Sequence, residues 1–142
     1  RLEKAKKMGA DHTILIPEKN LEKEIEKFTE GEGIPVVIDT VCIPASFEQS
    51  VQLACPAGRV VVIGLKNKPS QITMADITKK ELTFIGSRLN CNCFDEVING
   101  LEERSLNHQL FVTHIFHYTE IEHAFELIRE HPQDVLKVVV TF

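Results

Sequence analysis

The clearest feature of the hydrophobic pattern is a set of short apolar runs that do not alternate with polar residues. They cover residues 36–38, 60–63 and 82–86, and proline, glycine or charged residues bound each run. Unbroken runs of this length predict strands that are covered on both faces, as in a parallel sheet. We therefore expect three buried parallel strands in the middle of the chain.

Helical patterns lie between and around these runs. Apolar residues at i, i+4 and i+7 over residues 21–28 predict one amphipathic helix. Residues 46–49 read Ser-Phe-Glu-Gln, which is a capping box, and the helix that it opens is expected to stop at Pro56. A strand, a helix and a strand joined by short links make a right-handed crossover unit.

The flanking segments continue the alternation of helix and strand. We expect helices over 1–8, 94–101 and from a capping box at 119–122 onward, and strands over 12–16, 111–116 and 136–142. Alternating elements of this kind predict an α/β fold with a doubly wound parallel sheet. Ligands of such sheets bind beyond the carboxyl ends of the strands, which here are residues 39–41, 63–65 and 86–89.

Composition excludes several classes of function. The chain has 142 residues, enough for a real core, and its 43% hydrophobic and 26% charged residues are ordinary for a globular protein. A net charge of −5 without a basic stripe argues against a nucleic-acid partner. The apolar runs are too short for a membrane helix and no secretory signal is visible, so a cytoplasmic location is expected.

No metal site is predicted from the cysteines and histidines. Of the four cysteines, Cys91 and Cys93 are separated by one residue, which is poor spacing for zinc. None of the six histidines forms a ligand-spaced set with a carboxylate. We therefore expect these residues to be core or surface residues, with no catalytic residue and no metal ligand in the chain.

Several segments taken in order resemble the C-terminal part of a zinc-type, medium-chain alcohol dehydrogenase. The matching segments are residues 1–11, 80–90, 113–114, 124–125 and 136–142. The stretch Gly-Ser-Arg-Leu-Asn at 86–90 points to the branch of sorbitol, threonine and L-galactonate dehydrogenases and the starvation-sensing protein B. No single motif is diagnostic, and the resemblance rests on the ordered set.

This resemblance implies a truncated Rossmann-type sheet. The first two strands and their glycine-rich loop are missing, residues 1–105 form the rest of the dinucleotide-binding domain, and residues 106–142 return toward a catalytic domain. The implied parent enzyme transfers hydride between a polyol or sugar-acid secondary alcohol and NAD or NADP, with a zinc that lowers the pKa of the alcohol. The zinc ligands lie outside this chain, so the chain alone is expected to be inactive.

The resemblance also assigns residues to the cofactor. Thr40 and Val41 match the adenine side, whereas Arg1 matches a basic position near the adenosine ribose. Ile63, Gly64 and Leu65 match the segment beside the nicotinamide ribose, and Ser87, Arg88 and Leu89 match the stretch that meets the carboxamide.

Structural explanations of the same residues stay open. The loop at Thr40 fits a plain strand–helix turn as well as a cofactor site. Gly64 can be explained as a turn glycine, and Arg88 as a solvated surface arginine. Asp39 ends the fourth strand of the family's sheet, not the second, and is therefore not expected to hold a ribose. Cys42 departs from the glycine that the family commonly has at this turn.

The missing strands create a physical problem, because strand 12–16 would have no neighbour and strand 36–38 would expose a raw edge. We expect either that the two strands pair or that another chain fills the gap. A self-contact is also expected through residues 72–84, which are apolar at Ile72, Met74, Ala75, Ile77, Leu82 and Phe84. The alternative to a dehydrogenase fragment is a non-catalytic nucleotide-binding, regulatory or dimerisation module.

Overall fold

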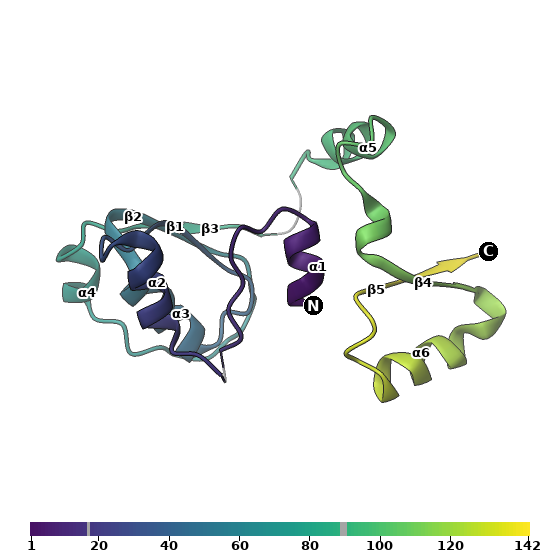
Figure 1. The fold of residues 1–142 in the computed structure, drawn as a ribbon, viewed down its shortest axis with the longest axis horizontal. Coiled ribbons are helices and arrows are strands. Elements are labelled where there is room, and N and C mark those ends of the chain that lie inside the picture. Colours follow the sequence, from purple (N-terminus) through teal and green to yellow (C-terminus); the bar gives the residue numbers. More distant parts are fainter. Residues whose placement is uncertain (17, 89–90) are drawn as a thin grey trace. The chain divides into compact units, whose positions relative to one another are not determined.

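The computed structural model describes residues 1–16, 18–88 and 91–142. The chain divides into two compact units, of which one comprises Arg1–Thr13 with Asn92–Phe142 and the other comprises Ile14–Cys91. Each unit contains its own parallel sheet (Figure 1).

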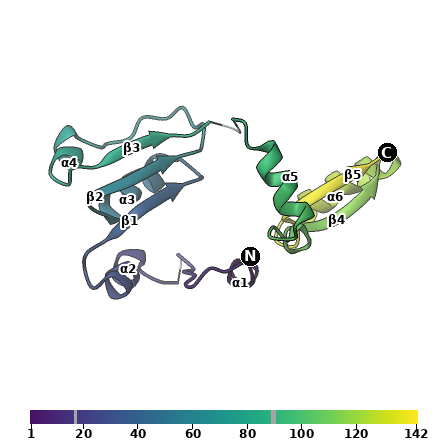
Figure 2. The ribbon, with the colours of Figure 1, turned by 90° about the horizontal axis from the view of Figure 1, so that it is seen from above.

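A three-stranded parallel sheet forms the centre of the unit Ile14–Cys91. The strands β1 (Ile34–Asp39), β2 (Ala54–Val62) and β3 (Thr83–Gly86) lie side by side in this order (Figure 2). Helix α2 (Leu21–Thr29) precedes β1, α3 (Pro44–Leu53) connects β1 to β2, and α4 (Met74–Thr78) lies between β2 and β3. The prediction of three parallel strands is confirmed.

One face of this sheet packs against α3. In the parallel register Val37 pairs with Val60, and Val60 pairs with Phe84, so these three side chains form a row on one face. The row joins Phe47 and Val51 of α3 in a hydrophobic cluster in which Val60 is fully buried. Burial of side chains of this size stabilises the fold by about 1.5–3 kcal/mol each.

The opposite face of the sheet is solvent-exposed. The next register row contains Ile38 and Ile85, which are 57% and 43% exposed, and Val36 on the same face is 47% exposed. The prediction that the strands are covered on both faces is therefore wrong for these described residues. The reason is that α3 and the segment leading into β3 supply their packing side chains to the other face only.

The boundaries of α3 and β2 also differ from the prediction. Helix α3 begins at Pro44 and ends at Leu53, and Ser46 is its third residue, whose Oγ accepts from the Ile43 amide at 3.1 Å. Pro56 therefore does not stop a helix but lies inside β2, where the register with β1 shifts. Proline lacks an amide hydrogen, so within a sheet it is tolerated at such an irregularity.

Two further differences concern the ends of this unit. Residues 12–16 form no strand, and among the described residues β1 pairs with β2 alone. The expected pairing of 12–16 with β1 is therefore wrong, because a strand exists only through the ladder partner that this segment lacks. The short helix α4 was not predicted; its start is a capping box between Thr73 and Asp76.

The other unit contains α1 (Leu2–Lys7), α5 (Phe94–Glu102), η1 (His108–Leu110), β4 (Val112–His117), η2 (Tyr118–Glu120), α6 (Ile121–Glu130) and β5 (Lys137–Thr141). Strands β4 and β5 pair in parallel, with α6 as their connection and Ala124 of α6 buried. The capping box before α6 joins His117 and Glu120 instead of residues 119 and 122. No helix of the described part of the chain is long and apolar enough to cross a membrane.

Candidate cofactor-binding site

The three strands of the larger sheet end at the same level. Asp39 pairs with Val62, and Val62 pairs with Gly86, so these three residues form the last register row. The segments that follow them, residues 40–42, 63–65 and 87–88, therefore leave the sheet from one edge, which we call the carboxyl edge. The structure thus brings together most of the positions that the sequence predicts to bind a cofactor. Leu89 lies outside the described residues.

Asp39 organises the loop after β1. Its side chain is 5% exposed, and its carboxylate accepts hydrogen bonds from the Val41 amide at 3.0 Å, the Cys42 amide at 2.9 Å and the Ser46 hydroxyl at 2.8 Å. Burial raises the pKa of this carboxyl, but the hydrogen bonds from Cys42, Ser46 and Val41 outweigh burial and hold the pKa below its usual value. The buried carboxylate is therefore engaged by groups of its own loop and of the start of α3.

Cys42 joins the loops after β1 and β2. Its Sγ accepts a hydrogen bond from the Gly64 amide at 3.0 Å and donates one to the Asp39 carbonyl at 3.1 Å. The Ile63 amide also donates to the Asp39 carbonyl at 3.0 Å. Cys42 and Ser46 were not predicted as site residues; the signal available in the sequence was the aspartate at a strand end, which commonly accepts from amides two and three residues on.

Gly64 fits closely against the first loop. A Cβ on Gly64 would lie 2.7 Å from Cys42 Cβ and 2.9 Å from the Val41 carbonyl oxygen, so no side chain is accommodated there. At Gly86, by contrast, a Cβ would meet nothing within 4 Å. Packing within the protein is therefore sufficient reason for a glycine at position 64.

The remaining residues of the carboxyl edge present side chains to solvent. Val41, Ile63 and Leu65 are 54%, 42% and 68% exposed, and Thr40, Ser87 and Arg88 are exposed too. The Ser87 amide donates to the Val62 carbonyl at 2.9 Å, which extends the ladder beyond β3. Exposed apolar side chains beside exposed polar ones offer a surface on which a planar aromatic ring can lie while its polar groups stay in reach of hydrogen-bond partners.

A cavity of about 580 Å³ adjoins this edge on the α3 side of the sheet. Cys42 and Gly64 form part of its wall, Phe47 and Val62 belong to its apolar lining, and Lys66 contributes a positive charge.

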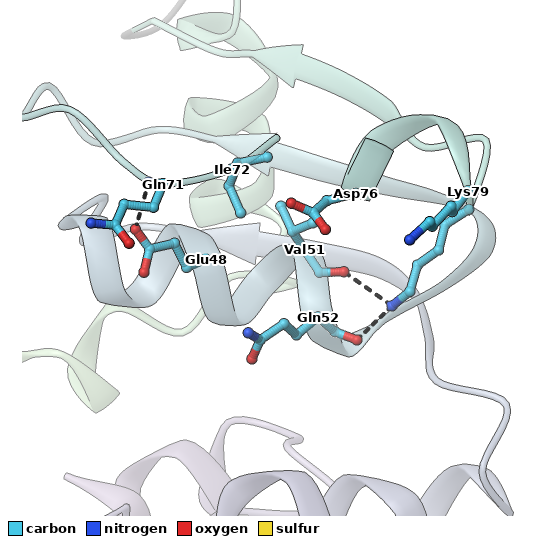
Figure 3. A pocket seen from close by; sticks show the side chains of 8 residues that line it. Glu48, Val51, Gln52, Gln71, Ile72, Asp76 and Lys79 are labelled. Atoms are coloured by element: carbon cyan, nitrogen blue, oxygen red, sulfur yellow. Dashed lines mark hydrogen bonds between the residues drawn. The ribbon is translucent and has the colours of Figure 1, made fainter. Parts of the chain in front are cut away.

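A second cavity, of about 430 Å³, lies between α3 and α4 (Figure 3). Its polar groups already serve the local structure: Glu48 accepts from the Gln71 amide at 2.8 Å, and Asp76 accepts from Thr73. Lys80 donates to the carbonyls of Val51 and Gln52 at the end of α3 and to that of Ala54. This cavity is therefore less suited to a ligand than the carboxyl edge.

Arg1, the remaining predicted residue, belongs to the other unit. Its guanidinium donates to the carbonyls of Pro132 and Val135, at 3.0 and 3.4 Å, and so fastens the start of the chain to the segment before β5. Within the described ranges no group of three or more histidine, cysteine, aspartate or glutamate side chains is arranged to hold a metal ion.

Comparison with known proteins identifies the family. The profile of the zinc-binding dehydrogenases matches residues 1–103, which is more than half of the chain. The chain belongs to the zinc-binding dehydrogenase family. The resemblance to zinc-type alcohol dehydrogenases that the sequence suggested is thereby confirmed.

Individual relatives of this family agree. The starvation-sensing protein RspB of Escherichia coli K12 is 38% identical over 144 residues, and the L-threonine 3-dehydrogenase of Pyrococcus horikoshii is 35% identical over 135 residues. These alignments cover 100% and 91% of this chain but only 41% and 38% of the relatives. The chain therefore spans about two fifths of the length of these dehydrogenases.

Solved structures confirm the truncated Rossmann-type fold. The alcohol dehydrogenase rspB from E. coli CFT073, solved in complex with the cofactor NADH, superimposes with a TM-score of 0.90 at 34% sequence identity. The superposition covers 99% of this chain and 41% of that dehydrogenase. The alcohol dehydrogenase of Thermus sp. ATN1 gives a TM-score of 0.87 at 28% identity.

Proposed function

We propose that this chain is the nicotinamide-binding part of an NAD(P)-dependent oxidoreductase that transfers hydride to or from a secondary alcohol of a polyol or sugar acid. The observation that carries the proposal is the carboxyl edge, where three parallel strands end in one register row and present residues 40–41, 63–65 and 87–88 together. The NADH bound to the structurally similar rspB dehydrogenase supports a dinucleotide as the ligand.

The residues of the edge suit a dinucleotide. Exposed Val41 would pack against the adenine, and exposed Ile63 and Leu65 would pack near the nicotinamide. Main-chain groups of Ser87 and Arg88 would orient the carboxamide and so select which face of the ring offers its hydride. The cofactor, when bound, supplies the hydride chemistry. We further propose that residues 1–105 belong to the cofactor domain and that residues 106–142 return to a catalytic domain.

Zinc does not fit the described residues, because they contain no suitable cluster of ligands. We therefore assign the zinc of such an enzyme to residues outside this chain. Since a glycine-rich phosphate loop is also lacking from the sequence, the chain alone is proposed to be inactive and to bind cofactor weakly.

Titration of the chain with NADH and with NADPH, followed by cofactor fluorescence, tests the proposal. We expect weak saturable binding, with a dissociation constant of about 1 mM. Leu65→Asp should abolish it, since a charge would replace an apolar contact. Leu15→Asp alters an exposed leucine that is not one of the predicted cofactor-binding residues and should leave the affinity unchanged. Equal affinities for all three proteins would refute the site.

A turnover assay separates binding from catalysis. The chain is incubated with zinc, NAD or NADP and a set of polyols and sugar acids, and the formation of reduced cofactor is followed. No turnover is expected from the chain alone. Turnover without any further chain would contradict the proposed inactivity.

A further inference from the structure

Cys42 occupies a backbone conformation that normally favours glycine. Its φ is +52°, in the left-handed region, where a side chain is disfavoured unless local contacts compensate. We propose that the Cys42 thiol is a positioning residue, which ties the adenine-side loop to the nicotinamide-side loop and fixes the Gly64 backbone for cofactor binding. This inference rests on the proposed function of the carboxyl edge.

The contacts of the thiol support this role. Sγ accepts from the Gly64 amide at 3.0 Å and donates to the Asp39 carbonyl at 3.1 Å, so one side chain uses both of its hydrogen-bonding capacities to connect two strand ends. The Cys42 amide is held at the same time by the Asp39 carboxylate at 2.9 Å. Cys42 is therefore held in the loop after β1 while its thiol contacts the loop after β2.

The fit between the two loops makes the bridge specific. The space beside the Gly64 Cα is occupied by Cys42 Cβ and Sγ, which lie 2.7 and 2.9 Å from where a Gly64 Cβ would stand. Cys42 is 9% exposed and also lines the apolar cavity with Phe47 and Val62. A thiol suits this place because it packs as a small apolar group and still accepts a hydrogen bond.

The backbone of Gly64 determines where its two neighbours on the carboxyl edge lie. Gly64 lies between exposed Ile63 and Leu65, so a shift of its backbone moves both residues that are proposed to face the nicotinamide. The thiol then acts on the cofactor through Gly64, without touching the cofactor itself.

Two variants separate the thiol bridge from backbone strain. Cys42→Ala removes Sγ and keeps a Cβ in the left-handed conformation, whereas Cys42→Gly removes Sγ and relieves the backbone. Cys55→Ala is the matched control, because it removes a half-buried thiol from β2 away from the edge. Amide hydrogen exchange at Gly64 and NADH titration are measured on all of these chains.

The bridge predicts that the Gly64 amide exchanges roughly 3- to 10-fold faster in both Cys42 variants, as expected for loss of one hydrogen bond. The NADH dissociation constant should rise by a similar factor in both variants, including Cys42→Gly, in which the fold is not strained. Cys55→Ala should change neither quantity.

Unchanged exchange at Gly64 in both Cys42 variants would overturn the bridge. Faster exchange with unchanged NADH affinity would overturn the positioning role. A wild-type chain that binds no NADH refutes the proposed function, and the exchange rate at Gly64 then still decides whether the thiol holds this loop.

Discussion

Asp39 concentrates three hydrogen bonds on one buried carboxylate, so its ionisation should affect stability. Because its pKa in the folded chain lies below the usual value, its stabilising contribution is present above that usual value and is lost as the pH falls through the folded-state pKa. Asp39→Asn should reduce the free energy of unfolding at neutral pH by about 1–3 kcal/mol. The difference from wild type should shrink in acid.

Urea unfolding at neutral and acidic pH measures this effect. Exposed Asp11→Asn is the control and should stay within about 0.5 kcal/mol of wild type. A difference between wild type and Asp39→Asn that is the same at every pH would show that the ionisation of Asp39 is not responsible.

The two edge glycines allow a second test at this scale. Gly64→Ala places a Cβ 2.7 Å from Cys42 Cβ and 2.9 Å from a backbone oxygen, so it should destabilise the chain by about 1–3 kcal/mol. Gly86→Ala enters open space and should be close to neutral. Thermal unfolding of both variants measures these changes in stability. Equal losses of stability in Gly64→Ala and Gly86→Ala would contradict the close fit at Gly64.

At the scale of elements, α3 is fixed at its carboxyl end by a lysine from another segment. Lys80 donates to the carbonyls of Val51, Gln52 and Ala54, where a cation is favoured by the helix dipole. Lys80→Met should lower the free energy of unfolding by about 1–2 kcal/mol. Urea unfolding measures this loss. Lys79→Met, at the exposed neighbouring lysine, should have little effect. A similar loss of unfolding free energy in Lys79→Met would argue that the contacts of Lys80 with the end of α3 are not responsible.

The elements also show where the sequence is informative. Unbroken apolar runs identified β1, β2 and β3, and helical spacing identified α2, α5 and α6. The same patterns did not predict burial, because one face of the sheet and the apolar residues Phe94, Val97 and Ile98 of α5 are exposed. The strand expected at 12–16 failed because a strand depends on a partner that local sequence does not specify. The carboxyl edge followed from parallel topology, but the contact of Cys42 with Gly64, 22 residues apart, could not be predicted from spacing.

At the scale of the whole molecule, self-association through residues 72–84 remains a prediction. Ile72, Ile77 and Phe84 pack against the core of the sheet, so the surface left for a partner is centred on Met74, which is 87% exposed. Light scattering over a range of concentrations should give a mass above that of one chain. Met74→Asp should lower the measured mass. Met8→Asp is the control, because Met8 is also exposed, at 52%, and lies outside residues 72–84; it should leave the mass unchanged.

A mass of one chain at every concentration would refute that contact. A mass above one chain that Met74→Asp leaves unchanged would instead point to another surface, such as the open edge of β1.

The hydrogen bonds of Asp39 have a consequence for the entropy of binding. A loop that is disordered before a ligand arrives loses conformational freedom on binding, at a cost of about 1–2 kcal/mol for each residue that is fixed. Because Asp39 already holds Val41, Cys42 and Ser46, that loss has occurred during folding for the loop after β1. Even a short chain can thus meet its ligand with one side of the site ordered in advance.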